Sequence, residues 1–458
     1  MVQLNHRPIT LFVAAAALAV AVPSGAQEPP TVVAFTNVNV VPMDRERVLA
    51  NQTVVVRDGR IAEIGPAARV RVPDDALRID GRGRYLVPGV AEMHAHIPGG
   101  NASPAWVERV LFLYLANGVT TIRGMLGGPS HLTLRDRAAR GEILSPTIYT
   151  SGPSFNGNSA TSPEVARRMV EEQRAAGYDF LKIHPGVPRV AFDTMAATAQ
   201  RVGIRFSGHV PLEVGLERAL EARYASIDHL DGYLEWLAGM PRGPSQWFGL
   251  NLAGRVNESR IAQAARITRE AGVWVVPTEA LMESYVGSEP PEEMARWPGM
   301  EYLPAAMVRQ WIQQLTNFRS QGAWTPERAE RFLAIRKRLI RELHAAGVGI
   351  LLGSDAPQVM NVPGFSIHRE LRSYVAAGLT PYQALETGTR NVARFFGAER
   401  EFGTVEAGKR ADLVLLDADP LADIGNFRRQ AGVMVGGRWL PREEVERRLA
   451  TIAAAPGE

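Results

Sequence analysis

Apolar and polar residues alternate differently in successive parts of this 458-residue chain. Residues 31–80 carry short apolar runs in strand-like alternation, and two of them meet at an Asp58-Gly59 pair, a strong signal for a β-hairpin. Between residues 85 and 399, short apolar runs are separated by stretches with helical spacing. Strand-like runs return after residue 400. The pattern predicts a long β/α region between small β units.

The central region has room for eight successive βα units. After a first strand that begins near Arg84, the strand-like runs are 118–125, 147–154, 178–184, 204–210, 225–230, 273–278 and 348–355. Eight such units predict a (β/α)8 TIM barrel, whose active site lies at the C-terminal ends of the strands. An open doubly wound sheet is the alternative. We expect residues 85–399 to form the barrel, and residues 27–84 and 400–458 to join in a small β-sandwich domain.

The first 26 residues are typical of a secretory signal peptide. His6 and Arg7 precede an apolar run from Ile9 to Val22, and small residues follow up to Ala26. This pattern predicts cleavage after Ala26 and a protein that is exported, either periplasmic or secreted. No later stretch is apolar enough for a membrane span, so no membrane anchor is expected after cleavage.

Charge and cysteine content exclude several classes of function. The chain has 51 basic and 48 acidic residues, for a formal net charge of +3. Its densest basic run, from Arg336 to Arg341, has apolar residues at helical spacing and is typical of a solvated helix face, so no nucleic-acid partner is expected. The absence of cysteine excludes disulfide bonds and a thiol nucleophile.

Two histidines end the first predicted strand of the barrel, His94 and His96. Residues two apart on a strand point to the same face, so both imidazoles can reach one metal ion. Other residues with metal-binding or catalytic chemistry stand at the ends of later predicted strands: Lys182, His184, His209, His229 and Asp355. Histidines scattered through a core would show no such preference. The sequence therefore predicts a metal centre at the mouth of the barrel.

A pair of divalent ions at this centre would need an anion between them, because the two cations repel each other. Lys182 could supply that anion after carbon dioxide converts its amine to a carbamate; a lysine in a salt bridge is the alternative. Asp355 can bind an ion and also act as a general base. Its alternative role is to cap the helix that follows.

The chain resembles the metal-dependent amidohydrolase superfamily in the residues at its predicted strand ends: His94, His96, Lys182, His209, His229 and Asp355. The resemblance covers nearly the whole chain after the signal peptide, and the segment Gly403–Val414 is very characteristic of it. The chain is most similar to the imidazolonepropionase-related group, which contains bacterial Xaa-Pro dipeptidases. True imidazolonepropionases lack the bridging lysine, so Lys182 favours the dipeptidase-like branch.

The resemblance implies a ligand set for two divalent ions, with zinc as the first choice. His94, His96 and Asp355 would bind the more buried ion. His209 and His229 would bind the second, and the carbamate of the lysine in the fourth strand would bridge the two. Asp355 would also move the proton during catalysis, with that lysine counted among the catalytic residues.

Four further residues are candidates for substrate binding. Arg123 could bind a substrate carboxylate, and an ion pair at the barrel rim is the alternative. Tyr233 could donate a hydrogen bond to the substrate. His368 could reach the pocket, although packing at a helix start is its default role. His184 faces the same side as Lys182 and is either a partner of a ligand or a substrate contact.

The functional prediction is an exported binuclear amidohydrolase. Its metal-bound hydroxide would attack an amide or peptide bond in a dipeptide, an N-acyl amino acid or a related small amide. Long aromatic-rich connections near 231–259 and 279–325 would either shape the substrate pocket or hold a helical subdomain. Alternatives are a mononuclear or binuclear hydrolase of cyclic amides or lactones, and a non-catalytic exported binding protein. The sequence is compatible with a homo-oligomer.

Overall fold

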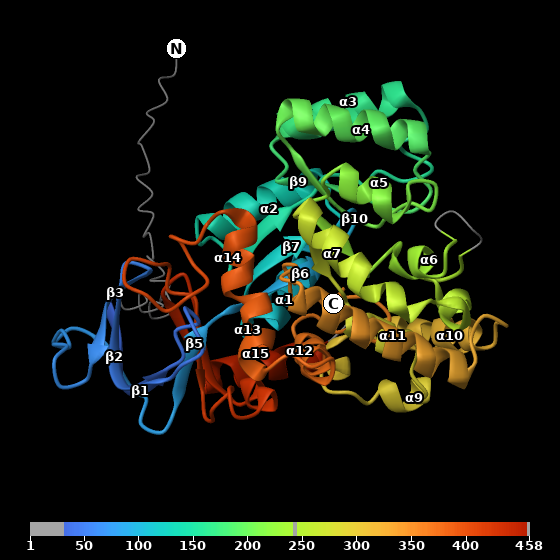
Figure 1. The fold of residues 1–458 in the computed structure, drawn as a ribbon. Coiled ribbons are helices and arrows are strands. Elements are labelled where there is room, and N and C mark those ends of the chain that lie inside the picture. Colours follow the sequence, from blue (N-terminus) through green and yellow to red (C-terminus); the bar gives the residue numbers. More distant parts are fainter. Residues whose placement is uncertain (1–31, 241–244, 456–458) are drawn as a thin grey trace, which may run out of the picture.

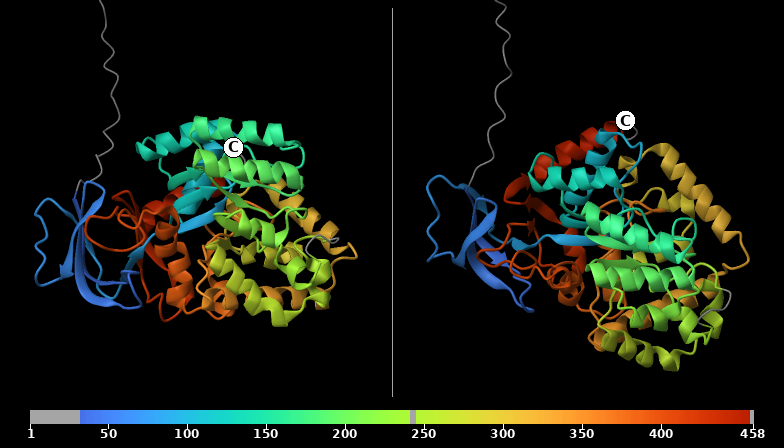
Figure 2. Two further views of the ribbon diagram at one scale, coloured as in Figure 1. Left: turned by 45° about the horizontal axis from the view of Figure 1, so that its top comes forward. Right: turned by 90° about the horizontal axis from the view of Figure 1, so that it is seen from above.

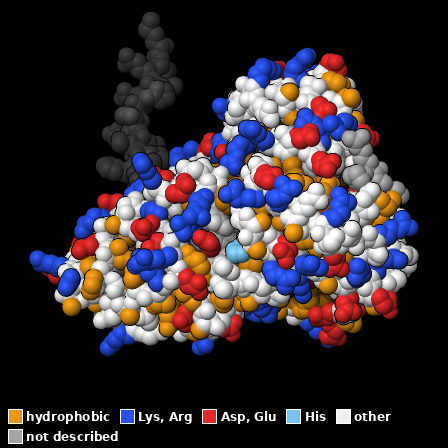
Figure 3. Space-filling model, viewed as in Figure 1, with side chains coloured by type: hydrophobic (Ala, Val, Ile, Leu, Met, Phe, Trp, Pro, Cys, Tyr) orange, Lys and Arg blue, Asp and Glu red, His pale blue; other side chains and the backbone are white. Residues whose placement is uncertain are grey.

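The computed structural model describes residues 32–240 and 245–455. The predicted signal peptide lies outside these residues. Within the described part of the chain, no helix combines the length and the apolar character needed to cross a membrane. On the face shown in Figure 3, basic and acidic side chains are interspersed.

Strands and helices follow the predicted order along the chain (Figure 1). The strands are β1 (Val32–Val40), β2 (Leu49–Arg57), β3 (Arg60–Pro66), β4 (Leu77–Asp80), β5 (Tyr85–Pro88), β6 (Val90–Ala95), β7 (Val119–Gly124), β8 (Thr147–Thr150), β9 (Phe180–Ile183), β10 (Arg205–Gly208), β11 (Ser226–Asp228), β12 (Trp274–Val276), β13 (Leu413–Leu416), β14 (Gln430–Val435) and β15 (Arg438–Pro441). The α-helices are α1 (Pro104–Leu115), α2 (Pro129–Ala139), α3 (Pro163–Ala176), α4 (Arg189–Val202), α5 (Gly215–Glu221), α6 (Tyr233–Leu237), α7 (Ile261–Ala271), α8 (Glu279–Val286), α9 (Pro291–Met294), α10 (Ala305–Arg319), α11 (Pro326–Ala345), α12 (Ile367–Ala376), α13 (Pro381–Gly388), α14 (Arg390–Phe396) and α15 (Arg442–Ala454).

Strands from both ends of the chain form one eight-stranded sheet. Its order is β15-β14-β13-β5-β1-β2-β3, with β4 paired to β1. The predicted hairpin is confirmed: β2 and β3 meet at Asp58 and Gly59, whose φ angles of 50° and 77° are those that a tight two-residue turn requires. Phe35, Leu415 and Met434 belong to one buried cluster, so the two terminal segments share a core. Figure 2 shows the blue strands at one end of the molecule, beside the red C-terminal segments.

Two parallel sheets carry the central region, with orders β6-β7-β8 and β9-β10-β11-β12. A parallel bridge between Ser151 and Phe180 connects them where β8 ends and β9 begins. Helices follow most of these strands, and Figure 1 shows α3 and α4 packed side by side outside β9 and β10. The predicted mixed α/β class is therefore confirmed.

The predicted strand at 348–355 is not a regular strand, although it occupies the expected place. Ile350 makes a single bridge to β12, and the carbonyl of Leu352 accepts a hydrogen bond of 2.8 Å from the N–H of Met93 in β6. Hydrogen bonds thus run from β6 through β12 and back to β6. Asp355 interrupts this pairing, because its φ of 64° turns the backbone out of the extended conformation. Pairing resumes at Ala356, which makes a parallel bridge to Ala95 of β6.

The two long connections are largely helical. Residues 231–259 contain α6 and a 3-10 helix at Leu250–Arg255, and residues 279–325 contain α8, α9 and α10. Met294, Trp311 and Leu315 form a satellite core with Val359 and Met360, which follow the Asp355 segment. The second connection therefore packs directly against the chain that leads away from Asp355.

Arg336 corrects one prediction about the basic run on α11. This side chain is fully buried and forms a 2.6 Å ion pair with Glu279 of α8, whereas Arg338 is exposed and pairs with Glu258. The run is therefore a solvated face only in part. Helical spacing fixed the orientation of the apolar residues, but it could not reveal a buried carboxylate partner on another helix.

Candidate metal centre

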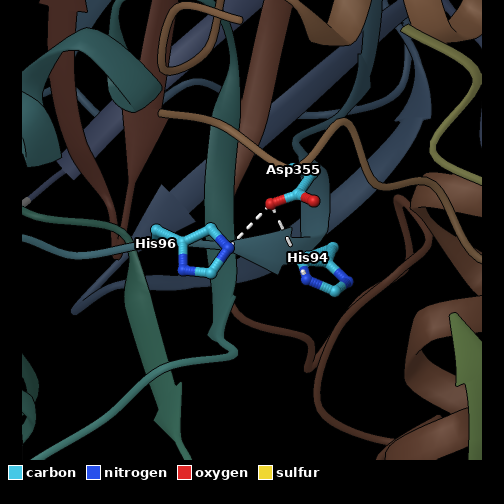
Figure 4. A group of neighbouring side chains, drawn as sticks. All are labelled: His94, His96 and Asp355. Carbon is cyan, nitrogen blue, oxygen red and sulfur yellow. Dashed lines mark hydrogen bonds and ion pairs between the residues drawn. The ribbon is translucent and has the colours of Figure 1, made fainter. Parts of the chain in front are cut away.

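The end of β6 brings His94 and His96 to the carboxylate of Asp355 (Figure 4). Nε2 of His96 lies 2.7 Å from Oδ1 of Asp355, and Nε2 of His94 lies 3.7 Å from the same oxygen. One ligand atom from each residue can be chosen so that all three lie within 4.8 Å of one another. The i, i+2 spacing on a strand and the turn at Asp355 together produce this cluster.

Glu92 connects β6 to the segment that carries Asp355. Its carboxyl group lies 3.1 Å from the backbone nitrogen of His94, and 2.7 and 2.6 Å from the backbone nitrogen and Oγ of Ser354. Burial raises the pKa of Glu92 to about 8. Glu92 was not predicted to be functional, because it acts through hydrogen bonds that join two distant segments.

Asp228 and Arg123 form a buried ion pair behind His94. Oδ2 of Asp228 lies 3.0 Å from Nδ1 of His94, and Oδ1 of Asp228 accepts a 3.3 Å hydrogen bond from Nη2 of Arg123. Nε of Arg123 also donates to the carbonyl of Met93 at 2.7 Å. The structure therefore gives Arg123 the ion-pair role that the sequence left as an alternative, and no free face toward a substrate carboxylate. Asp228 was missed, although a carboxylate inside an apolar strand was a signal.

His209 and His229 form a second group next to the first. Their ring centroids are 4.4 Å apart, and the ring of His229 is 4.5 Å from that of His94. Nδ1 of His209 lies 2.7 Å from Oδ2 of Asp231, and Nδ1 of His229 lies 2.8 Å from Oγ1 of Thr278. Partners at Nδ1 orient both rings and leave Nε2 for a ligand, as in many metal sites. Nε2 of His229 is buried without a hydrogen-bond partner.

Lys182 lies between the two groups of histidines. Its Nζ is 3.3 Å from Nε2 of His94, and the side chain is fully buried. Burial lowers the pKa of Lys182 to about 8, although the charges of Asp228 and Asp355 oppose this shift. A larger fraction of this amine is therefore neutral and nucleophilic near neutral pH than in an exposed lysine.

Asp355 remains ionised in spite of its burial. Desolvation raises the pKa of this carboxyl group, but His94, His96 and the hydrogen bond from His96 outweigh that effect and hold the pKa below its ordinary value. An ionised carboxylate among imidazole nitrogens is both a ligand for a divalent cation and an acceptor for a proton.

Of the remaining predicted residues, His184 lies beside the centre, whereas Tyr233 and His368 have partners elsewhere. His184 stacks on His209 with a centroid distance of 5.1 Å, and its Nδ1 is buried without a partner. Tyr233 is buried, with its hydroxyl 2.9 Å from Oγ1 of Thr268. His368 lies 3.0 Å from Oδ1 of Asn117. Among the described residues, neither Tyr233 nor His368 forms a hydrogen bond or a ring contact with the histidine cluster.

These residues fit a divalent metal. Imidazole and carboxylate are the donors that zinc and similar ions prefer. Nε2 of His229 is buried without a hydrogen-bond partner, so it is available to bind a metal ion. The structure brings together seven of the predicted side chains: His94, His96, Lys182, His184, His209, His229 and Asp355.

Most of the chain is similar to proteins of one known family. The model of a family described as the amidohydrolase family matches residues 85–440. An adenine deaminase from Ruegeria sp. (strain TM1040) is 25% identical over 80% of this chain, which spans only 51% of that protein. An imidazolonepropionase from Salmonella agona (strain SL483) is 23% identical, over 85% of this chain and 93% of that protein.

Solved structures with the same overall fold include two hydrolases. A putative prolidase from Bifidobacterium longum has a TM-score of 0.65 and 26% identity, and covers 93% of this chain and 100% of its own. A bottromycin amidohydrolase has a TM-score of 0.70 and 23% identity, and covers 94% of this chain and 92% of its own.

Proposed function

The chain belongs to the amidohydrolase family, and from this premise we propose that it is a metal-dependent hydrolase of an amide or peptide bond. The observation that carries the proposal is the cluster in which Asp355, His94 and His96 share one small volume, with Lys182 in contact with His94. The circuit of strands that presents this cluster is, in this proposal, a (β/α)8 barrel.

The residues present would hold two divalent ions. His94, His96 and Asp355 would bind one, and His209 and His229 the other. Bound ions of this kind polarise a carbonyl group and lower the pKa of water. Lys182 lies between the two groups. Its neutral amine would add to carbon dioxide and lose a proton to solvent, and the resulting carbamate would supply the anion that two cations need between them.

Asp355 would move the proton in the reaction. One carboxylate oxygen lies against His96 and His94, and the other lies 3.8 Å from Nδ1 of His229, so the group stands between the two sets of ligands. It would accept the proton of the attacking water and return it to the leaving nitrogen. The substrates proposed are dipeptides, N-acyl amino acids and related small amides, and residues 1–26 support export.

Hydrolysis of a cyclic amide or a lactone is the second candidate. The specific observation in its favour is the match to an imidazolonepropionase over 93% of that protein. The chemistry at the carbonyl is shared, and metal number separates the binuclear proposal from the mononuclear form of this second candidate.

Elemental analysis of metal per chain tests the proposal, on protein purified with bicarbonate and zinc. Wild type is expected to hold about two ions, Lys182→Ala one or fewer, and the matched control Lys337→Ala about two. A similar value near one in all three would make Lys182 structural and favour a mononuclear hydrolase of cyclic amides. Full metal content without turnover on a broad amide panel would favour a binding protein.

A further inference from the structure

Two consecutive aromatic residues of the first long connection lie beside the second group of histidines. The ring centroid of Phe248 is 5.3 Å from that of His229 and 6.0 Å from that of His209. Trp247 meets Phe248 edge to face at 5.1 Å. The aromatic pair therefore borders the candidate metal centre directly.

The backbone of this pair is held in an uncommon conformation. The φ angles of Trp247 and Phe248 are 43° and 55°, and Gly249 follows at 82°. A left-handed conformation is unfavourable for a residue other than glycine and persists only where the surroundings fix it. A Cβ added at Gly249 would stand 2.7 Å from Cβ of Leu234, so α6 packs closely beneath the turn.

Trp247 packs against aromatic residues of three helices. Its ring lies 4.9 Å from Tyr285, 4.9 Å from Phe318 and 5.9 Å from Phe332, which belong to α8, α10 and α11. The aromatic neighbours of Phe248 are Trp247 and the two histidines, and its side chain also packs against the main core. Phe248 is only partly buried, so part of its side chain remains accessible beside the two histidines.

Tyr285 extends the apolar surface through its ring, whose centroid lies 4.9 Å from that of Trp247. Burial, and then the negative charge of Asp355, raise the pKa of Tyr285 to about 12, so the phenol stays neutral. Its hydroxyl oxygen accepts a 2.8 Å hydrogen bond from Nε2 of Gln314. We call the surface of Trp247, Phe248 and Tyr285 the aromatic wall.

We propose that the aromatic wall selects substrates with an aromatic or bulky aliphatic group on the acyl side of the bond that is cleaved. A carbonyl held between the two groups of histidines would place that substituent against the accessible part of Phe248. Burial of a phenyl group there is favourable because it removes apolar surface from water, and a ring pair adds to this. The inference rests on the proposed function and names its substrate class.

Hydroxamates test this inference without turnover, because they bind a loaded metal centre and present their acyl substituent as a substrate would. Calorimetry would compare acetohydroxamate with benzohydroxamate on zinc-loaded protein. Wild type is expected to bind benzohydroxamate at least about tenfold more tightly. Phe248→Ala should reduce that ratio to about two or less, and Phe248→Leu should restore part of it. The control is Tyr302→Ala, because Tyr302 is an aromatic residue that pairs with Phe365 and lies outside the aromatic wall. This variant should keep the wild-type ratio.

Equal affinity of wild type for the two hydroxamates would overturn the inference while leaving the metal centre supported. A ratio unchanged in both Phe248 variants would overturn it as well. Failure of both hydroxamates to bind zinc-loaded wild type would instead contradict the proposed function, and the inference would fall with it.

Discussion

Asp355 shows at the scale of one residue how chemistry and backbone conformation are combined. Its φ of 64° lies in the left-handed region, which aspartate and asparagine enter more readily than other residues with a side chain. The same turn interrupts the irregular eighth segment and directs the carboxylate to His96 at 2.7 Å. Position 355 therefore requires a residue that suits both the turn and the ligand set.

Asp355→Asn is expected to keep the fold and most of the metal, because asparagine has the same shape and tolerates the same backbone. Turnover should fall at least about 100-fold, since an amide cannot accept the proton. Measurement of kcat together with metal content separates these effects, with Asp423→Asn as a control at an exposed turn. Unchanged turnover in Asp355→Asn would remove this residue from proton transfer.

Protonation of His368 on unfolding is expected to lower the stability of the protein in acid. Burial, aided by the charges of Arg428 and Arg372, lowers its pKa to about 3, whereas the pKa of an unfolded histidine is 6.5. Between these values the unfolded chain binds a proton at this position and the folded chain does not. The free energy of unfolding therefore falls as pH drops below 6.5, by up to about 1.4 kcal/mol per pH unit from this group.

His368→Gln keeps a side chain that can bond Asn117 and lacks this proton. Urea unfolding at about pH 7.5 and about pH 5 should show a smaller loss of stability in the variant than in wild type, by about 1–2 kcal/mol. The other histidines are common to both proteins, so the difference isolates position 368. Equal losses would mean that His368 becomes protonated in the folded state.

The sequence predicted the residues that converge at strand ends and failed where side-chain direction depends on distant partners. His94, His96 and Asp355 meet because their positions follow from strand geometry. Arg123 and Tyr233 instead turn to buried partners, Asp228 and Thr268, that lie about 100 and 35 residues away along the chain. Local spacing carries no information about those partners.

At the scale of elements, Arg336 joins α11 to the segments that hold the site. Besides its ion pair with Glu279 of α8, its Nη1 and Nη2 donate 2.8 Å hydrogen bonds to the carbonyls of His229 and Pro277. These carbonyls follow β11 and β12. One side chain thus fixes the ends of two neighbouring strands and a helix of the second long connection.

Arg336→Met should lower the free energy of unfolding by about 3–5 kcal/mol, because it leaves Glu279 buried without its cation. Denaturant titration would measure the loss. Arg338→Met on the same helix is the matched control, and removal of its exposed pair with Glu258 should change stability by at most about 1 kcal/mol. Similar values for both variants would show that Glu279 is protonated and needs no partner.

Regular elements with local signals were predictable, and elements that depend on tertiary contacts were not. The Asp58-Gly59 hairpin follows from two residues. The segment 348–355 has strand-like composition, but its backbone at Gly349 packs tightly against Trp274. A Cβ added at Gly349 would stand 2.1 Å from that ring, a tertiary contact that local composition does not reveal. The helices α8 to α10 were not predicted individually, because their apolar residues are divided between two cores. The apolar residues of α8 pack in the main core, whereas those of α9 and α10 pack in the satellite core around Met360.

For the whole molecule, the shared sheet makes each end of the chain necessary to the other. β13 pairs with β5 along its whole length, from Leu413 opposite Pro88 to Leu416 opposite Tyr85. Leu86 and Leu415 lie opposite each other and are fully buried. Loss of either segment would expose both an unpaired strand edge and an apolar core.

Deletion of residues 400–458 is therefore expected to abolish soluble, monodisperse protein, since exposed strand edges promote aggregation. Size-exclusion chromatography of the soluble fraction would measure this. A variant shortened only by residues 456–458 is the control and should behave as wild type. A soluble, metal-binding product from the long deletion would show that the central region folds without the shared sheet.

Pairing between early and late segments of the chain also has a consequence for biosynthesis. β5 pairs with Leu413–Leu416 and β6 is bonded to Leu352, and each of these late partners lies more than 250 residues further along the chain. Contacts so distant in sequence slow folding, because a long loop must close before they form. A ribosome that has released half of the chain has supplied neither partner. The nascent protein must then remain open, and available to chaperones, until almost all of it has been made.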